Sequence, residues 1–232
     1  MYLIYLIIAE GSVYAFRAFF FYEAIFFIGS KKINIFPFLP IGGGFFIGGI
    51  MKSKEFFDVR MMAEAGVMMA MSFVLFYFKV YQMPQSGALT IGSMIPLIIF
   101  TIRWGLARGF IVCALFGLLT LFTDNTVVHP IQFILDYPLP YGVVALGGIS
   151  FMKNKKNFWG YAPFIILGFV LRMTSHILSG VVFFKKFTPP GKTPLIYSLT
   201  YNLGYLVPEM LITLVLLFLI WEPIEKVIVR QN

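Results

Sequence analysis

The sequence predicts an all-α integral membrane protein built as a bundle of six transmembrane helices. Of its 232 residues, 59% are hydrophobic and only 12% are charged, and the mean hydropathy is +0.88. A soluble domain carries about 25% charged residues. Apolar runs in the chain also reach the roughly 20 residues that a helix needs to span a bilayer. Such a chain cannot form an ordinary polar surface, so lipid must be part of its solvent.

Short segments with turn and helix-breaking residues separate the predicted spans. Pro84 and Gly87 interrupt the chain after the first span, and Gly105 allows a tight link between the second and the third. Residues 153–157 and 185–194 are rich in lysine, asparagine or proline, which favours loops. The six spans cover residues 58–80, 89–103, 105–123, 131–151, 159–184 and 195–221.

The distribution of lysine and arginine predicts the orientation of these spans. With the segment before residue 58 in the cytoplasm, the inner segments hold ten basic residues and the outer segments hold four. Cytoplasmic loops of membrane proteins are the basic ones. We therefore expect residues 81–88, 124–130 and 185–194 to lie on the extracellular side of the cell membrane and the C-terminus to be cytoplasmic. The net charge of +8 is then a topology signal and does not indicate a nucleic-acid partner.

Residues 1–52 are predicted to be a hydrophobic extension, separate from a substrate-binding domain at 53–232. Three ionisable residues interrupt its first half, and its second half is rich in glycine and proline, which form poor helices. The extension either adds one or two further spans or is upstream sequence outside the functional protein. One added span would place the N-terminus outside the cell, and two would place it inside.

The sequence carries no pattern typical of an enzyme. Its single cysteine, Cys113, falls inside a predicted span, and no Cys/His spacing typical of a metal site is present. No Walker motif is present either, so hydrolysis of ATP by that route is excluded. We expect no catalytic residue, no metal and no cofactor.

Ionisable side chains inside the predicted spans each cost about 2.5–3.5 kcal/mol on insertion scales, and five of them are candidates for a specific role: Glu64, Asp136, Arg172, His176 and Glu209. Glu64 follows Arg60 by one helical turn, which predicts an ion pair at the end of the first span. Glu209 follows Pro208 in the last span and is predicted to satisfy a buried partner such as Arg172.

Asp136 admits two interpretations. It forms a buried ion pair with Arg172, or it anchors a cationic or amine-bearing ligand in a half-apolar pocket. Arg172 and His176 are four residues apart, so they share one face of the fifth span. If Arg172 lies nearby, its charge favours a neutral His176.

Polar residues converge at the predicted outer ends of three spans. Asp136 lies near the outer end of the fourth span, His176 and Phe184 lie in the outer half of the fifth, and Tyr197 and Asn202 lie in the outer half of the sixth. A solute would enter from this side. The pattern therefore predicts a solute-binding site at the extracellular end.

Aromatic side chains near this end offer stacking surfaces for a flat ring. The candidates are Phe116, Tyr137, Phe184 and Tyr197. For each of them, packing in the core or in an interfacial aromatic belt is the alternative.

From about Phe57 to the C-terminus, the sequence resembles the thiamine-specific S components of energy-coupling-factor transporters, the ThiT (YuaJ) family. The matching motifs follow the order and spacing of the family. They are Gly92-Ser93-Met94-Ile95-Pro96, Arg103-Trp104-Gly105-Leu106, Val127-Val128-His129-Pro130 with Gln132, Leu135-Asp136-Tyr137-Pro138-Leu139, His176 with Gly180, and Tyr197-Ser198-Leu199 with Tyr201-Asn202.

The resemblance implies a six-helix membrane subunit that captures thiamine at the extracellular side without enzymatic activity. It also implies partners, namely a transmembrane coupling subunit and two cytoplasmic ATPases, which alone would use ATP. Gly66 and Ala70 fall on the family's coupling surface, and Gly87 falls near a position where some members have tryptophan. The implied ligand contacts are Asp136, Tyr137, His176, Tyr197, Asn202, Phe184 and Phe116.

Two further functions compete with this interpretation. The first is an autonomous secondary transporter of thiamine or a related vitamin, coupled to protons through Asp136 or Glu209. The second is a membrane enzyme, against which the lack of a nucleophile–base pair or metal-ligand set counts.

Overall fold

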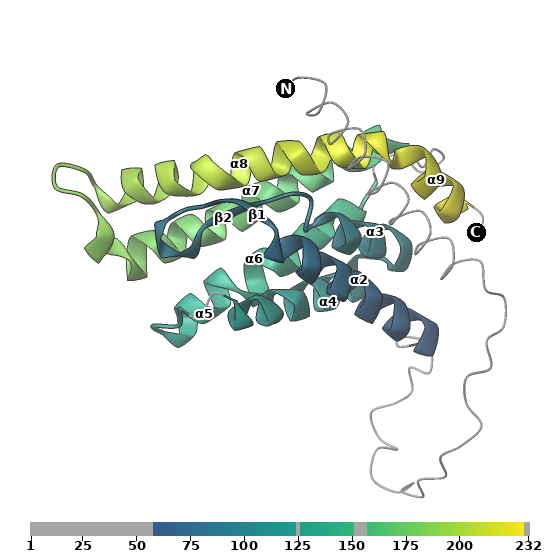
Figure 1. Cartoon of the computed structure of the whole chain (residues 1–232), viewed down its shortest axis with the longest axis horizontal. Helices are drawn as coiled ribbons and strands as arrows, with labels where there is room; N and C mark the ends of the chain where they lie inside the picture. The colour runs from purple at the N-terminus through teal and green to yellow at the C-terminus, as the bar shows by residue number, and fades with distance from the viewer. Residues whose placement is uncertain (1–57, 124–125, 151–156, 230–232) are drawn as a thin grey trace, which may run out of the picture. The chain divides into compact units, whose positions relative to one another are not determined.

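The computed structural model of the chain describes residues 58–123, 126–150 and 157–229, and this part is predominantly helical (Figure 1). The predicted helical membrane fold is confirmed. The extension predicted for residues 1–52 lies outside the described residues, and the division of the chain at residue 52 stays a prediction.

Among the described residues, three helices are long and apolar enough to cross a membrane: α2 (Val59–Tyr77), α7 (Phe158–Phe183) and α8 (Pro194–Leu219). With 19, 26 and 26 residues they are about 28 to 39 Å long. The side chain of Asn157 accepts a hydrogen bond from Gly160 N at the start of α7, and that of Thr193 accepts one from Ile196 N at the start of α8. These caps satisfy N–H groups that a helix start leaves free. Helices α7 and α8 run side by side along their length (Figure 1).

The remaining predicted spans contain shorter helices. The chain forms α3 (Ile95–Trp104), then α4 (Leu106–Leu119), which the 3₁₀ turn η2 (Thr120–Phe122) continues. Gly105 joins α3 to α4 with φ 87°, a left-handed conformation that favours glycine. The tight link predicted at this position is therefore confirmed.

The predicted continuous span 131–151 is wrong, because this segment is broken into α5 (Pro130–Asp136), α6 (Pro138–Gly142) and the 3₁₀ helix η3 (Val143–Gly148). A proline disfavours the helical conformation in the residue before it. Tyr137, which precedes Pro138, has φ −120° and ψ −83°. The break leaves Asp136 at the end of a short helix, where its side chain can face a cavity.

The start of the second predicted span is also wrong. Residues before Ile95 form an antiparallel hairpin of β1 (Lys79–Gln82) and β2 (Ala88–Thr90), joined by the 3₁₀ turn η1 (Pro84–Ser86). Gln85 and Ser86 both have positive φ, 59° and 70°, which non-glycine residues adopt mainly in turns. The hairpin lies at the end of the bundle that also carries α5 and the α7–α8 connection (Figure 1).

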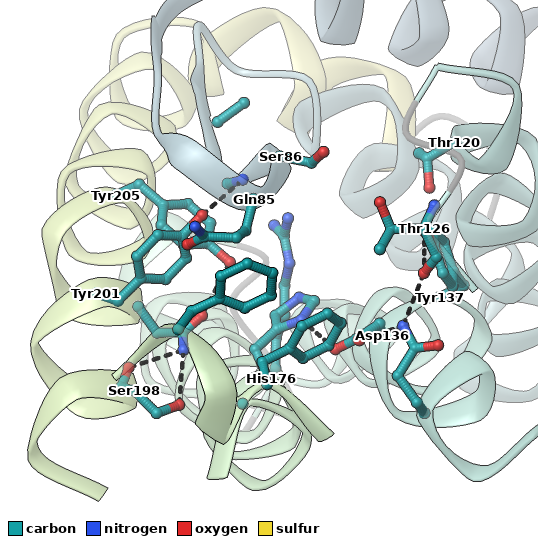
Figure 2. Close-up of a pocket in the computed structure, with 18 of the residues that line it drawn as sticks. Gln85, Ser86, Thr120, Thr126, Asp136, Tyr137, His176, Ser198, Tyr201 and Tyr205 are labelled. Atoms are coloured by element: carbon teal, nitrogen blue, oxygen red, sulfur yellow. Dashed lines mark hydrogen bonds and ion pairs between the residues drawn. The ribbon is translucent and has the colours of Figure 1, made fainter. Parts of the chain in front are cut away.

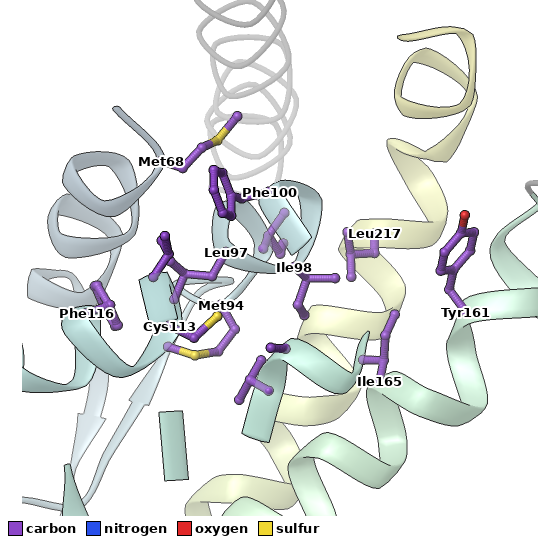
Figure 3. Close-up of a cluster of buried hydrophobic side chains, with 14 of the residues drawn as sticks. Met68, Met94, Leu97, Ile98, Phe100, Cys113, Phe116, Tyr161, Ile165 and Leu217 are labelled. Carbon is purple, nitrogen blue, oxygen red and sulfur yellow. The ribbon is translucent and has the colours of Figure 1, made fainter. Parts of the chain in front are cut away.

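Apolar side chains around α3 fill the core of the bundle. Met94, Leu97, Ile98 and Phe100 are fully buried and meet residues of α2, α4, α7 and α8 (Figure 3). The short helix α9 (Trp221–Val229) closes the opposite end from the hairpin, where Trp221 is buried.

Glu64 does not form the predicted helix-end pair with Arg60. It is buried, and its carboxylate lies 3.0 Å from Arg103 Nη1 and accepts a hydrogen bond of 3.0 Å from Trp104 Nε1. The tertiary approach of α3 to α2 supplies these two partners, which spacing within one helix cannot reveal. The pair ties α2 to the α3–α4 turn.

Candidate functional site

A cavity of about 140 Å³ opens at the hairpin end of the bundle. This volume is many times that needed for one water molecule. Residues of α5 and α6 line one side and residues of α8 line the other, with the hairpin across the top and α7 below (Figure 2). Six of the seven predicted ligand contacts line it, namely Asp136, Tyr137, His176, Phe184, Tyr197 and Asn202.

The cavity holds one carboxylate with an extensive set of hydrogen-bond donors, which we call the Asp136 cluster. It comprises Asp136, Gln132, His176 and Ser179. Oδ2 of Asp136 accepts hydrogen bonds from Gln132 Nε2 (2.6 Å) and Ser179 Oγ (2.7 Å), and Oδ1 lies 3.2 Å from His176 Nδ1. Two donors therefore share Oδ2, and the imidazole is the partner of Oδ1. No arginine or lysine pairs with Asp136 in the part of the chain that the structure describes.

Gln132 connects this carboxylate to the segment before α5. Its amide nitrogen also donates to Thr126 O (3.0 Å), and its amide oxygen accepts from Val128 N (3.0 Å). The hydroxyl of Tyr137 lies within 3.4 Å of the same Thr126 carbonyl. The segment before α5 and the Asp136 side chain are therefore held together through Gln132.

A second buried carboxylate lies deeper, in what we call the Glu209 cluster, formed by Glu209, Arg172, Thr90 and Ser93. Glu209 Oε2 lies 3.1 Å from Arg172 Nη1, while Oε1 accepts from Thr90 Oγ1 (2.6 Å) and Ser93 Oγ (3.4 Å). Arg172 also lies over the ring of Tyr141, 4.6 Å from its centroid. The predicted pairing of Glu209 with Arg172 is confirmed, and the alternative ion pair between Asp136 and Arg172 is wrong.

Three tyrosines of α8, one per turn, face the Asp136 cluster across the cavity. Tyr197, Tyr201 and Tyr205 are spaced by four residues, so they share one helix face. The hydroxyl of Tyr201 accepts a hydrogen bond from Gly87 N (2.9 Å) and donates to Pro84 O, and that of Tyr197 donates to Gln85 Oε1 (3.3 Å). This tyrosine row therefore fastens the hairpin over the cavity.

Asn202 lines the cavity, but its side chain is engaged within α8. Its amide nitrogen donates to Ser198 O (2.8 Å), and its amide oxygen accepts from Tyr205 (3.0 Å). A ligand that contacts Asn202 must share or replace these bonds.

Phe116 is the predicted contact that does not line the cavity. It is fully buried in the core, where its ring packs edge-on against Phe76 (6.1 Å between centroids) and Tyr141 (5.5 Å). Tyr141 and Phe76 line the cavity in its place. Phe116 therefore packs in the core, which was the alternative to ligand stacking for this residue. Phe184, in contrast, lines the cavity beside Phe187.

Sequence reasoning missed residues that complete the cavity. Gln85 and Ser86 fall in the predicted outer loop and are not among the predicted ligand contacts, and neither is Tyr201, although its spacing from Tyr197 places both tyrosines on one face. Gln132 lies one turn before Asp136, so helical periodicity alone could have associated the two side chains. Gln85 carries no comparable signal, because its position depends on the hairpin.

The described residues contain no group of three or more His, Cys, Asp and Glu side chains that could hold a metal ion. The cavity instead offers one carboxylate, one imidazole, three amides and several aromatic faces, and the one guanidinium in its lining, that of Arg172, is paired with Glu209. This arrangement suits a flat, polar, cationic molecule held by charge, hydrogen bonds and stacking.

Comparison with known proteins gives a consistent result. The family model described as "Thiamine transporter protein (Thia_YuaJ)" matches residues 62–229. A thiamine transporter ThiT of Bacillus subtilis is 34% identical over 149 residues, covering 60% of this chain and 77% of that protein. ThiT of Lacticaseibacillus paracasei is 29% identical over 136 residues, covering 53% and 68%. The solved structure of ThiT from Listeria monocytogenes shares the fold, with a TM-score of 0.63 at 22% identity over 72% of this chain and 96% of that one.

Proposed function

This chain belongs to the thiamine transporter family, and from this premise we propose that it is the thiamine-binding S component of an energy-coupling-factor importer. It is a multi-pass membrane protein of a transport family rather than an enzyme. In the proposed role it captures thiamine from the extracellular side, with its C-terminus in the cytoplasm.

One observation carries the proposal: the Asp136 carboxylate, which pairs with no arginine or lysine among the described residues, faces a row of tyrosines across a cavity. Thiamine combines a cationic thiazolium ring with an aminopyrimidine that both donates and accepts hydrogen bonds. Asp136 would balance the positive charge, and His176 and Asn202 would meet the polar edge of the pyrimidine. Tyr137, Tyr197 and Phe184 would supply aromatic faces, at about 0.5–2 kcal/mol for each cation–π contact.

The exposed surface of α2 is suited to contact with a helix of a partner subunit. Gly66 and Ala70 are four residues apart and both exposed, and a side chain added at Gly66 would meet no atom within 4 Å. Small residues in this spacing allow close approach of another membrane helix. We propose that the coupling subunit docks here and that two cytoplasmic ATPases, bound through that subunit, supply the energy.

The competing function, autonomous proton-coupled transport, requires a carboxylate that exchanges protons during the cycle. Glu209 is engaged by an arginine and two hydroxyl groups and is fully buried, which disfavours it as a proton carrier. Asp136 remains the candidate for this alternative.

Thiamine uptake into proteoliposomes distinguishes the two functions. Vesicles with this chain, the coupling subunit and both ATPases should accumulate thiamine when ATP is enclosed on the ATPase side. Vesicles with this chain alone should not accumulate it under an imposed pH gradient. Accumulation by the chain alone under that gradient would instead establish the secondary transporter.

A further inference from the structure

The two oxygen atoms of Asp136 have different surroundings. Oδ2 accepts two short hydrogen bonds, from Gln132 of α5, which is buried in the wall of the cavity, and from Ser179 of α7, which is buried and does not line it. Oδ1 faces His176, a cavity-lining residue, across a longer distance of 3.2 Å. Oδ1, with one longer contact, therefore keeps more capacity to accept a hydrogen bond from a ligand than Oδ2, which has two short ones.

We propose that Gln132 and Ser179 are positioning residues that present Oδ1 of Asp136 to thiamine, an inference that rests on the proposed function. The carboxylate would otherwise rotate about its terminal torsion, which is a soft one. Two hydrogen bonds to Oδ2, donated from different helices, fix this torsion. Oδ1 of Asp136 then accepts a hydrogen bond from the ligand at one defined position, which lies next to His176.

Helix register explains why these two residues suit the task. Gln132 precedes Asp136 by four residues on α5, and Ser179 follows His176 by three on α7. Each pair shares one helix face. Gln132 reaches Oδ2 from one turn earlier on α5, and the contact between α5 and α7 brings Ser179 to the same oxygen. Both bonds act on the carboxylate itself, so the inference requires neither residue to touch the ligand.

Ser175 offers a matched control on the same face of α7. It lies one turn before Ser179, it is buried, and its hydroxyl donates to the backbone oxygen of Leu135 at 2.6 Å. It thus makes a hydrogen bond of similar length between the same two helices, but to the backbone instead of the Asp136 carboxylate. A general loosening of the α5–α7 contact would follow from Ser175→Ala as well as from Ser179→Ala.

The test is a double-mutant cycle on the full-length protein in detergent, with thiamine affinity measured by calorimetry. We expect Ser179→Ala to weaken binding about 3- to 10-fold. The same substitution in an Asp136→Asn background should change affinity less than about twofold, because the group that it positions is gone. Ser175→Ala should leave affinity within about twofold of the parent protein.

Gln132→Met repeats the test from the other helix, so the inference remains testable if one variant does not fold. It should also weaken binding in the parent and have little effect beside Asp136→Asn. Equal losses in the two backgrounds, or an equal loss from Ser175→Ala, would show a merely structural role and overturn the inference. Failure of the parent protein to bind thiamine would instead overturn the proposed function.

Discussion

Two carboxylates of this protein, Asp136 and Glu209, lie at the same end of the bundle, yet their environments differ in one decisive respect. Glu209 is 1% exposed and is matched by Arg172. Asp136 is 17% exposed and has uncharged or weakly basic donors around it. Both carboxylates are well hydrogen-bonded, so hydrogen bonding alone does not separate a structural role from a binding role.

The difference lies in where the compensating charge comes from. A buried carboxylate needs a cation or a dense set of donors to offset its desolvation. The protein supplies the cation for Glu209, whereas the Asp136 cluster leaves room for a cation that arrives with the ligand. This contrast makes separate predictions for stability and for affinity.

The largest effect is expected for stability when the Glu209 cluster is broken. Glu209→Gln leaves Arg172 buried without its counter-charge, which typically costs about 3–5 kcal/mol. The thermal unfolding of the protein in detergent measures this loss. Glu222→Gln is the control, because Glu222 forms an exposed pair with Lys226 (2.6 Å) and should lower the unfolding temperature little. Similar unfolding temperatures for both variants would contradict the structural role of Glu209.

The next effect is on affinity at the Asp136 cluster. Asp136→Asn keeps the shape of the side chain and removes the charge that would balance the thiazolium ring. Loss of a charge-assisted contact costs about 1.5–3 kcal/mol, which is roughly one to two decades of thiamine affinity. Calorimetry on folded protein measures the change, and folded Glu209→Gln should lose less affinity. An affinity equal to that of the parent would remove Asp136 from the site.

A smaller effect is expected at the tyrosine row. Tyr201→Phe removes the hydroxyl that bonds Gly87 N and Pro84 O, so the hairpin is held less firmly over the cavity. Loss of these bonds should accelerate thiamine dissociation about 3- to 10-fold, measurable by stopped-flow fluorescence. Tyr81→Phe is the control, because Tyr81 lies on the same hairpin with its side chain exposed. Unchanged dissociation in Tyr201→Phe would show that the hairpin does not retain the ligand.

No effect on affinity is expected from the surface of α2. Gly66→Leu and Ala70→Leu point a bulky side chain away from both carboxylate clusters, so thiamine binding should be unchanged. Uptake in vesicles with the partner subunits should fall, because the added side chain holds a partner helix away. Gly66→Ala is the conservative control and should keep uptake. Normal uptake by both leucine variants would place the coupling surface elsewhere.

The sequence predicted the end of the bundle at which a residue lies better than it predicted that residue's side-chain partners on other helices. Asp136, His176 and Tyr197 were expected at one end, because span direction and helical spacing determine which end a residue occupies. Partners depend on distances between elements. The expected partner of Glu64 was Arg60, one turn away, but α3 brings Arg103 and Trp104 to it instead.

The segments that close the cavity were the least predictable. The residues of β1, Lys79–Gln82, are too few to show a strand pattern, and the backbone conformation of Gln85 and Ser86 depends on the turn between the strands. The break in the fourth span was visible in Pro138, yet apolar composition suggested a continuous helix. The hairpin and the helix break are therefore recognised only from the structure, in which both border the cavity.

The central claim is that this cavity binds thiamine, and titration of the purified full-length protein with thiamine tests it most directly. With three tyrosines along one side of the cavity, the intrinsic fluorescence of the protein should change on binding. We predict saturation at one thiamine per chain, both in fluorescence and in calorimetry. A folded protein that shows no response to thiamine but is saturated by another vitamin would contradict the claim.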